Sequence, residues 1–110
     1  MLIDTHVWVA GLIRRAEMAG ASAVVARRGD GRAGAVILKT YNTLERSARL
    51  YVRAQGNDGE PLWIEPVNAD TEAQLDAYVE RQLRHDPDLW VVEVEDRQGR
   101  SFLDEPVANP

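Results

Sequence analysis

The stretch that decides the fold runs from Asp70 to Asp96 and reads DTEAQLDAYVERQLRHDPDLWVVEVED. In its first part, Leu75, Val79 and Leu83 recur at the spacing of one face of an amphipathic helix. Pro87 has no backbone N–H and disfavours the helical conformation at Asp86, so the helix is expected to end near His85. A β-rich run follows at once, and the stretch therefore predicts a helix followed directly by a strand.

Both elements of this stretch carry further signals in their sequence. Thr71 and Gln74 have the spacing of a capping box at the start of the helix. In the strand, Trp90, Val92 and Val94 share one face, whereas the opposite face turns from apolar residues to Glu93 and Glu95. The strand is predicted to begin buried on both faces and to finish with one face in water.

The preceding chain predicts one more helix and four short strands. Residues 5–19 have a broad apolar face, and Gly20 suits the position after a helix end. The expected strands cover residues 21–28, 33–41, 47–53 and 62–65, and residues 101–103 are a candidate for a brief last strand. The first two runs flank Gly29–Arg32, which is a typical hairpin connection with glycines available for positive φ.

This order, α-β-β-β-β-α-β, predicts an α+β domain. Consecutive hairpins favour a mainly antiparallel sheet of about five strands, because no crossover helix separates the middle strands. We expect the two helices to pack on one face of that sheet, giving a two-layer sandwich. Residues 1–103 are predicted to form a single domain, and the tail 104–110 is predicted to fray.

Composition limits the classes of function. The chain has no cysteine, so disulfides, zinc–thiolate sites and cysteine nucleophiles are excluded. No signal peptide or membrane-spanning run is recognised, and we expect a cytoplasmic protein without a membrane partner. Residues 1–55 carry nine Lys/Arg against four Asp/Glu, a net +5, whereas residues 56–110 carry four against fourteen, a net −10. This asymmetry indicates either a basic binding face or two halves that neutralise each other.

The segment Arg27–Gly34, RRGDGRAG, is the best candidate site. Its arginines Arg27, Arg28 and Arg32, together with glycine amides, have the chemistry to bind a phosphate or a carboxylate, and Asp30 belongs to the same candidate binding set. It is not a P-loop or a dinucleotide fingerprint, because those need a strand leading into a helix. A glycine-rich hairpin with solvated arginines explains the same residues.

A wider arginine surface is the alternative hypothesis. It would bind nucleic acid or a phosphorylated ligand through arginines, with Tyr41 and Tyr51 as stacking rings. The residues are Arg14, Arg15, Arg27, Arg28, Arg46, Arg49 and Arg53. The sequence pI of about 5.0 and the lack of a recognition motif argue against it, so nucleic acid is not an expected partner.

Trp63 is the second candidate for a contact surface. Tryptophan is enriched at protein interfaces, and Trp63 lies on a short strand where partial exposure is expected. With such exposure, a homodimer or an unidentified protein partner becomes the hypothesis. Core packing is the competing interpretation for Trp63, as it is for Trp8 and Trp90.

Signals for catalysis are weak. His85 lies beside Asp86 and Asp88, and Glu93 shares a strand face with Glu95. These groups suggest a hydrolase-like enzyme as a minor alternative. Each has a simpler explanation as a helix stop, a turn or a solvated strand end, so no catalytic residue, metal or cofactor is assigned.

Three segments carry a resemblance to a known family: WVAGLIRR, ARRGDGRAGAVILK and RQLRHDPDLWVVEVEDRQGRSFLDE. The chain resembles a small bacterial family of uncharacterised proteins, domain of unknown function fourteen-ninety-one. The resemblance spans nearly the whole length and implies a compact, single-domain, cytoplasmic bacterial protein. It assigns no site residue. The sequence therefore leaves the function unknown and favours a small non-enzymatic binding or protein-interaction domain.

Overall fold

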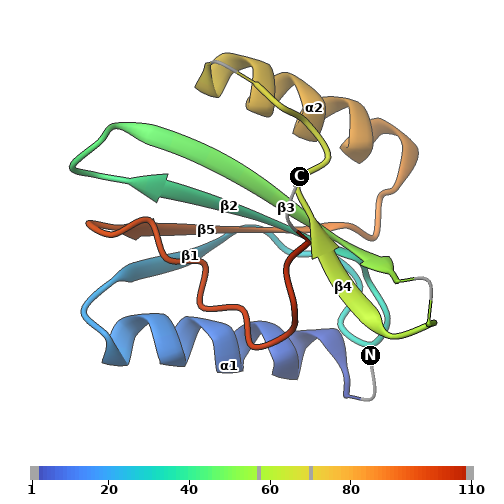
Figure 1. Ribbon diagram of the computed structural model, residues 1–110. Helices are drawn as coiled ribbons and strands as arrows, with labels where there is room; N and C mark the ends of the chain where they lie inside the picture. The colour runs from blue at the N-terminus through green and yellow to red at the C-terminus, as the bar shows by residue number, and fades with distance from the viewer. Residues whose placement is uncertain (1–2, 57, 70, 109–110) are drawn as a thin grey trace.

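The structure, a computed structural model, describes residues 3–56, 58–69 and 71–108. It contains two helices and a five-stranded sheet in the order predicted (Figure 1). The elements are α1 (Thr5–Met18), β1 (Ser22–Arg27), β2 (Val36–Asn42), β3 (Ser47–Gln55), β4 (Pro61–Ile64), α2 (Glu72–His85) and β5 (Trp90–Asp96). The prediction of an α+β fold with a mainly antiparallel sheet is confirmed.

The strand order in space is β1-β5-β2-β3-β4. The last strand, β5, is inserted between β1 and β2, antiparallel to β1 and parallel to β2. The predicted hairpin of residues 21–41 is therefore wrong, because β1 and β2 are not neighbours. Val91 and Val92 are buried on opposite faces of β5, as suits a central strand. The turn residues between β1 and β2 carry the chain past β5 instead of closing a hairpin.

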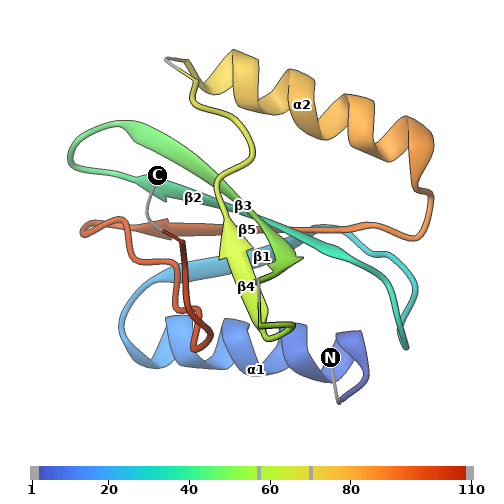
Figure 2. The same cartoon turned by 45° about the vertical axis from the view of Figure 1, so that its right-hand side comes forward.

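The two helices lie on opposite faces of the sheet, as Figures 1 and 2 show. On one face, here called the α1 face, Leu12 packs with Val36 and Leu38 of β2. On the other, the α2 face, Leu75 packs with Ile37 of the same strand. The expected two-layer sandwich with both helices on one face is wrong. Three consecutive apolar residues in β2 give the sheet two faces that both need cover, and one helix supplies each cover.

The second covered face explains why β3 differs from its predicted pattern. Leu50 is buried on the α2 face, as expected for the inward side of the strand. Alternation in the sequence predicts that Arg49, Tyr51 and Arg53 face outward, yet Tyr51 is buried on the α1 face. Alternation in the sequence correctly separates the two faces, but it does not show that a helix covers the more polar one.

Residues 71–96 fold as the sequence predicts. The side chain of Thr71 accepts a hydrogen bond from the Gln74 amide, and the Gln74 side chain accepts one from the Thr71 amide, which completes the capping box. The helix ends at His85. The strand β5 begins buried on both faces, and Glu95 is exposed near its end. Local signals in this stretch were sufficient because the cap depends on neighbouring residues, and the apolar pattern of a strand indicates which of its faces are buried.

The chain after β5 returns to β4. Residues 101–103 do not form the brief strand that the sequence suggested. Farther along, Val107 makes a parallel bridge with Trp63. The Trp63 amide donates to the Pro106 carbonyl at 2.9 Å, and the Ala108 amide donates to the Trp63 carbonyl at 2.8 Å. The segment that the sequence predicts to fray thus makes defined contacts as far as Ala108, along the outer edge of β4.

Candidate functional site

The arginine loop, residues 27–34, packs on the connection between α2 and β5. The Arg27 guanidinium donates to the Pro87 carbonyl at 3.0 Å, and the Arg28 guanidinium lies 4.9 Å from the centre of the Trp90 ring. The Trp90 indole N–H donates to the Asp30 carbonyl at 2.7 Å. Three of the residues predicted to bind a ligand therefore make contacts that fix the loop on its neighbours.

Backbone amides of the loop also donate hydrogen bonds within the protein. The Asp30 amide donates to the Asp88 carbonyl, the Ala33 amide to the Asp30 carboxylate, and the Gly34 amide to the Asp30 carbonyl. These three amides are not available to an anion, which weakens the hypothesis of a phosphate nest. At Gly29 and Gly34, an added Cβ would lie 2.1 Å and 2.4 Å from the Asp88 carbonyl oxygen. Both glycines allow a close approach of the backbone. The positive φ predicted for the glycines of the turn, Gly29 and Gly31, is not observed.

Ion pairs join the basic first half of the chain to the acidic second half. Of the six ion pairs among the described residues, five join a cation of the first half to a carboxylate of the second. They join Arg15 to Asp104, Lys39 to Glu72 and Asp76, Arg49 to Glu65, and Arg53 to Glu105. This pairing favours mutual neutralisation of the two halves and argues against a basic binding face.

The two tyrosines of the nucleic-acid hypothesis do not lie together. Tyr51 is opposite Leu38 and is buried on the α1 face. Tyr41 is opposite Ala48, which packs on the α2 side of the sheet. Because the rings lie on opposite faces, they do not form one stacking platform beside the arginines.

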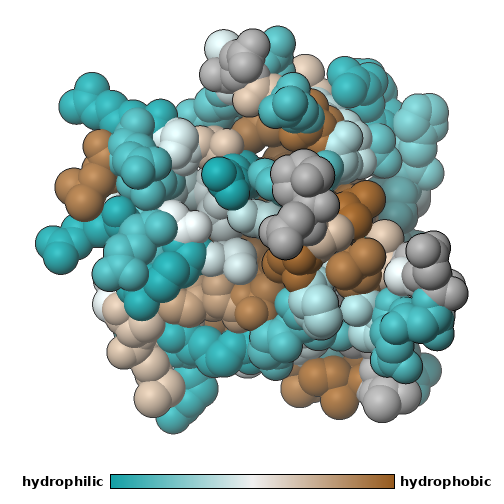
Figure 3. All heavy atoms as spheres, viewed as in Figure 1, coloured by the Kyte–Doolittle hydropathy of each residue, from teal (hydrophilic) through white to brown (hydrophobic). Residues whose placement is uncertain are grey.

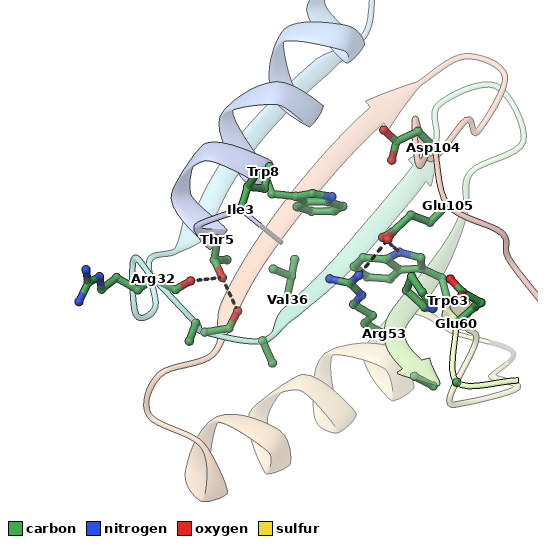
Figure 4. Close-up of a pocket in the computed structure, with 16 residues that line it drawn as sticks. Ile3, Thr5, Trp8, Arg32, Val36, Arg53, Glu60, Trp63, Asp104 and Glu105 are labelled. Carbon is green, nitrogen blue, oxygen red and sulfur yellow. Dashed lines mark hydrogen bonds and ion pairs between the residues drawn. The ribbon is translucent and has the colours of Figure 1, made fainter. Parts of the chain in front are cut away.

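An open groove of about 940 Å³ lies between the start of α1 and β4 (Figure 4). We call it the tryptophan groove. Its lining residues include Ile3, Thr5, Trp8, Arg32, Val36, Arg53, Glu60, Pro61, Trp63, Asp104 and Glu105. In Figure 3, apolar side chains reach the surface around β4 on this face of the molecule, with hydrophilic side chains to either side. The groove therefore combines an apolar wall with a charged rim.

Trp63 supports this groove from beneath. It is 0% exposed, so the expectation of partial exposure is wrong, and core packing is the correct interpretation. Its ring stacks on Trp8, with centroids 5.3 Å apart, and its indole N–H donates to the Glu105 carboxylate at 3.0 Å. Glu105 covers Trp63, although the sequence places it in a tail that is expected to fray. Because this contact joins residues 42 positions apart, no local feature of the sequence predicts it.

Arg53 and Glu105 form the polar side of the groove. One guanidinium nitrogen of Arg53 donates to the second oxygen of Glu105 at 2.9 Å, and both side chains are largely buried. The same carboxylate accepts from Trp63, so Glu105 is held at two points. In Figure 4 the Arg53 side chain lies alongside Val36 within the groove. Its other nitrogens make no bond to a described residue and can bind an acceptor there.

The start of α1 does not add an anion site to the groove. Its Thr5 amide donates to the Arg32 carbonyl at 3.1 Å, and its His6 amide donates to the Gly31 carbonyl at 3.0 Å. The Thr5 hydroxyl, also buried, donates to the Gly34 carbonyl at 2.9 Å. These bonds attach the helix to the arginine loop. Figure 4 shows the Arg32 side chain pointing away from the groove, which its backbone lines.

A smaller cavity of about 230 Å³ lies on the α2 face beside Lys39. The Lys39 ammonium donates to Glu72 at 2.6 Å and to Asp76 at 2.8 Å, while Glu93 and Glu95 line the same cavity. Burial lowers the pKa of Lys39, but the bonds to both α2 carboxylates outweigh it, and the net pKa is raised. Lys39 is therefore a charged structural bridge between β2 and α2.

His85 does not meet the carboxylates proposed with it. It is exposed at the end of α2 and lines neither cavity. Asp86 instead accepts a hydrogen bond from the Asp88 amide at 3.0 Å. Within residues 3–56, 58–69 and 71–108, no three His, Asp or Glu side chains gather so that they could hold a metal ion. None of the helices in this part of the chain is long and apolar enough to cross a bilayer.

With the geometry established, comparison with known proteins places the chain. The family model described as "Protein of unknown function (DUF1491)" matches residues 3–104. The chain belongs to the DUF1491 family. The resemblance seen in the sequence is therefore confirmed, and the family carries no assigned function to this chain. Among curated proteins, none matches it.

Solved structures include members of this family. A crystal structure of a DUF1491 family protein from Caulobacter crescentus is 57% identical, with a TM-score of 0.94 over 97% of this chain and 100% of that one. An NMR structure of a DUF1491 family protein from the same organism, also 57% identical, has a TM-score of 0.91 over 99% of each chain. The solution structure of protein Atu0922 from A. tumefaciens is 28% identical, with a TM-score of 0.81 over 100% of this chain and 98% of that one.

Proposed function

We propose that this DUF1491 protein is a small non-enzymatic binding domain, and that its ligand occupies the tryptophan groove. The observation that carries the proposal is the groove itself. At about 940 Å³ it has the size of a small-molecule site, and its apolar wall faces a small number of polar groups. Of the residues that the sequence analysis favoured for binding, Trp63 supports this groove and the backbone of Arg32 lines it.

The side chain that fits a ligand best is Arg53. It projects from the C-terminal part of β3, where Arg53 pairs with Trp63 of β4, so its position is fixed by the sheet. Its guanidinium keeps donors beyond the one bonded to Glu105, and such a planar fork matches a carboxylate. Val36 and Trp8 provide apolar surface beside it. The ligand class is therefore a small molecule with a flat apolar body and one carboxylate.

Binding is tested by titrating the protein with aromatic carboxylates of increasing size, such as benzoate and naphthoate, and recording amide NMR shifts. We expect shifts at groove residues and a loss of affinity of about tenfold in Arg53→Gln. Arg49→Gln is the matched control, because Arg49 lies on the same strand and face but outside the groove. The proposal fails if no compound shifts groove residues at millimolar concentration, or if both variants bind equally.

We also propose that two copies of the chain associate. We further propose that the protein acts in the bacterial cytoplasm, as the family resemblance implies. Light scattering of the purified chain measures the first, and cell fractionation measures the second. The arginine-rich alternative has less support, because Arg15 and Arg49 are already paired with carboxylates, and Arg27 and Arg28 pack on Pro87 and Trp90. A gel-shift assay at low salt that showed a stable nucleic-acid complex would reverse this preference.

A further inference from the structure

The two edges of the sheet differ in how they are covered. On β4, the outer edge is bonded at Trp63 by Pro106 and Ala108 of the same chain. On β1, the only strand partner is β5, and no other described backbone group bonds to Ser22–Arg27. Alternate residues of an edge strand point their N–H and C=O groups outward. The β1 edge is therefore ready to pair with another strand.

Both faces of this edge strand are apolar and exposed at its middle. Val24 is opposite Glu93, on the α2 side of the sheet, and 53% of its surface is exposed. Val25 is opposite Val92, on the α1 face, and is 40% exposed. Natural proteins usually protect an open edge with charges, proline or a β-bulge. Neither a charge nor a proline occurs between Ser22 and Ala26, and the register shift of β1 lies at its end, between Val25 and Arg27.

Charge along the edge is arranged in opposite signs at its two ends. Arg27 and Arg28 are exposed where β1 ends. Glu95 is exposed on β5 directly opposite Ser22, where β1 begins. A two-fold axis through the middle of an antiparallel pair reverses the ends, so it brings the arginines of one copy to the glutamate end of the other. The partner that fits this charge pattern is a second copy of the same chain.

We propose that two copies of this protein pair through β1, antiparallel and centred near Val24, to form one continuous ten-stranded sheet. This inference rests on the proposed association of two copies and names its surface. Arg27 of one copy then lies about two strand spacings, roughly 10 Å, from the backbone of Glu95 in the other. An arginine side chain spans most of that distance, and the Arg27 guanidinium has donors beyond the one bonded to Pro87.

The first test uses Val24→Lys with Leu44→Lys as its control. Leu44 is 73% exposed in the turn between β2 and β3, away from the β1 edge, so its variant adds the same charge elsewhere. Sedimentation over a range of concentration is expected to show a dimer for the native chain and for Leu44→Lys. The dissociation constant of Val24→Lys should rise at least about tenfold. A native chain that stays monomeric, or equal dissociation constants for the two variants, overturns the proposal.

The second test is a charge exchange between the ends of the edge. Arg27→Glu and Glu95→Arg should each weaken the dimer, because each places like charges together across the two-fold axis. The double variant should recover most of the native affinity, since it restores opposite charges in exchanged positions. Additive weakening in the double variant contradicts the proposed register. Thermal unfolding of each variant checks that the fold is unchanged.

These tests separate the β1 edge from the tryptophan groove. Val24→Lys leaves the groove residues intact, so it should bind an aromatic carboxylate like the native chain does. If Val24→Lys remains dimeric, association of two copies stands but the proposed surface is wrong. If no variant binds a carboxylate while the β1 variants dissociate as expected, the groove proposal fails alone.

Discussion

The indole rings of Trp8 and Trp63 stack with their centroids 5.3 Å apart and their planes 16° from parallel. Trp8 belongs to α1 and Trp63 to the edge strand β4, so this pair joins the two sides of the groove at its base. Aromatic pairs of this kind add specific contact energy to the burial of their area. The shape of the groove therefore depends on the same contact that stabilises the core.

Replacing Trp63 with alanine should destabilise the protein strongly. The side chain is fully buried, stacked and hydrogen-bonded, and truncation of such a residue costs about 3–5 kcal/mol. Urea unfolding measures the change, with Leu44→Ala as a control at an exposed position expected to stay within about 0.5 kcal/mol. Similar values for the two variants would mean that β4 is not part of the core.

The two bonds of Glu105 can be separated by substitution. Glu105→Gln keeps an acceptor for the Trp63 indole N–H but loses the charge that faces Arg53. Glu105→Ala removes both and leaves the indole N–H without its partner, so it should cost about 1–3 kcal/mol, and the glutamine variant should cost less. Chemical denaturation gives both values. Equal losses would show that the charge, and not the indole bond, holds the tail.

Local features of the sequence were sufficient where neighbours in the chain decide the structure. The capping box at Thr71, the helix end at His85 and the change in burial along β5 all follow from residues within a few positions. The position of β5 between β1 and β2 does not. A strand's pattern shows how deeply each face is buried, and several strands here share similar patterns, so the pattern does not name the neighbour.

The groove could not be predicted from the sequence either, because its residues lie far apart in the chain. Arg53 and Glu105 meet across 52 positions, and Trp8 meets Trp63 across the sheet edge. Nothing in the sequence around Glu105 distinguishes it from a solvated tail. The charge asymmetry was the one usable signal, because it suggested that cations of the first half meet carboxylates of the second, as Arg53 and Glu105 do.

Because of Asp96, the free energy of unfolding should depend on pH under acidic conditions. Its buried carboxylate accepts bonds from the Arg100 guanidinium, and this lowers its pKa from the usual 3.8 to about 2. A lowered pKa stabilises the folded state above the unfolded pKa, and this stability is lost as pH falls from about 4 to about 2. Asp96→Asn should flatten the unfolding free energy over that range, whereas the exposed control Asp88→Asn should not. An unchanged slope in Asp96→Asn would contradict the assignment.

The pKa of Lys39 should depend on its two partners. Burial alone lowers it, and the bonds to Asp76 and Glu72 reverse that effect and raise it. The double variant Glu72→Gln/Asp76→Asn removes both carboxylates, so their charges no longer oppose the effect of burial. The pKa of Lys39 should therefore fall relative to the native chain. NMR titration of the side chain measures it, with Glu80→Gln on α2 as a control. The same pKa in all three proteins would show that the ammonium is solvated.

The arginine loop should tolerate alanine at one glycine and reject it at another. At Gly34, an added Cβ would lie 2.4 Å from the Asp88 carbonyl oxygen and 2.8 Å from the Asp30 carbonyl oxygen, and backbone atoms cannot move aside cheaply. At Gly31, the nearest atom is the His6 ring nitrogen at 3.7 Å, an ordinary contact. We expect Gly34→Ala to destabilise the fold by about 1–3 kcal/mol, as overpacked sites do, and Gly31→Ala to change it by less than about 0.5 kcal/mol. Thermal unfolding of the two variants side by side makes the comparison. If both are tolerated, the loop does not rest on the α2–β5 connection, and its arginines are free for a ligand after all.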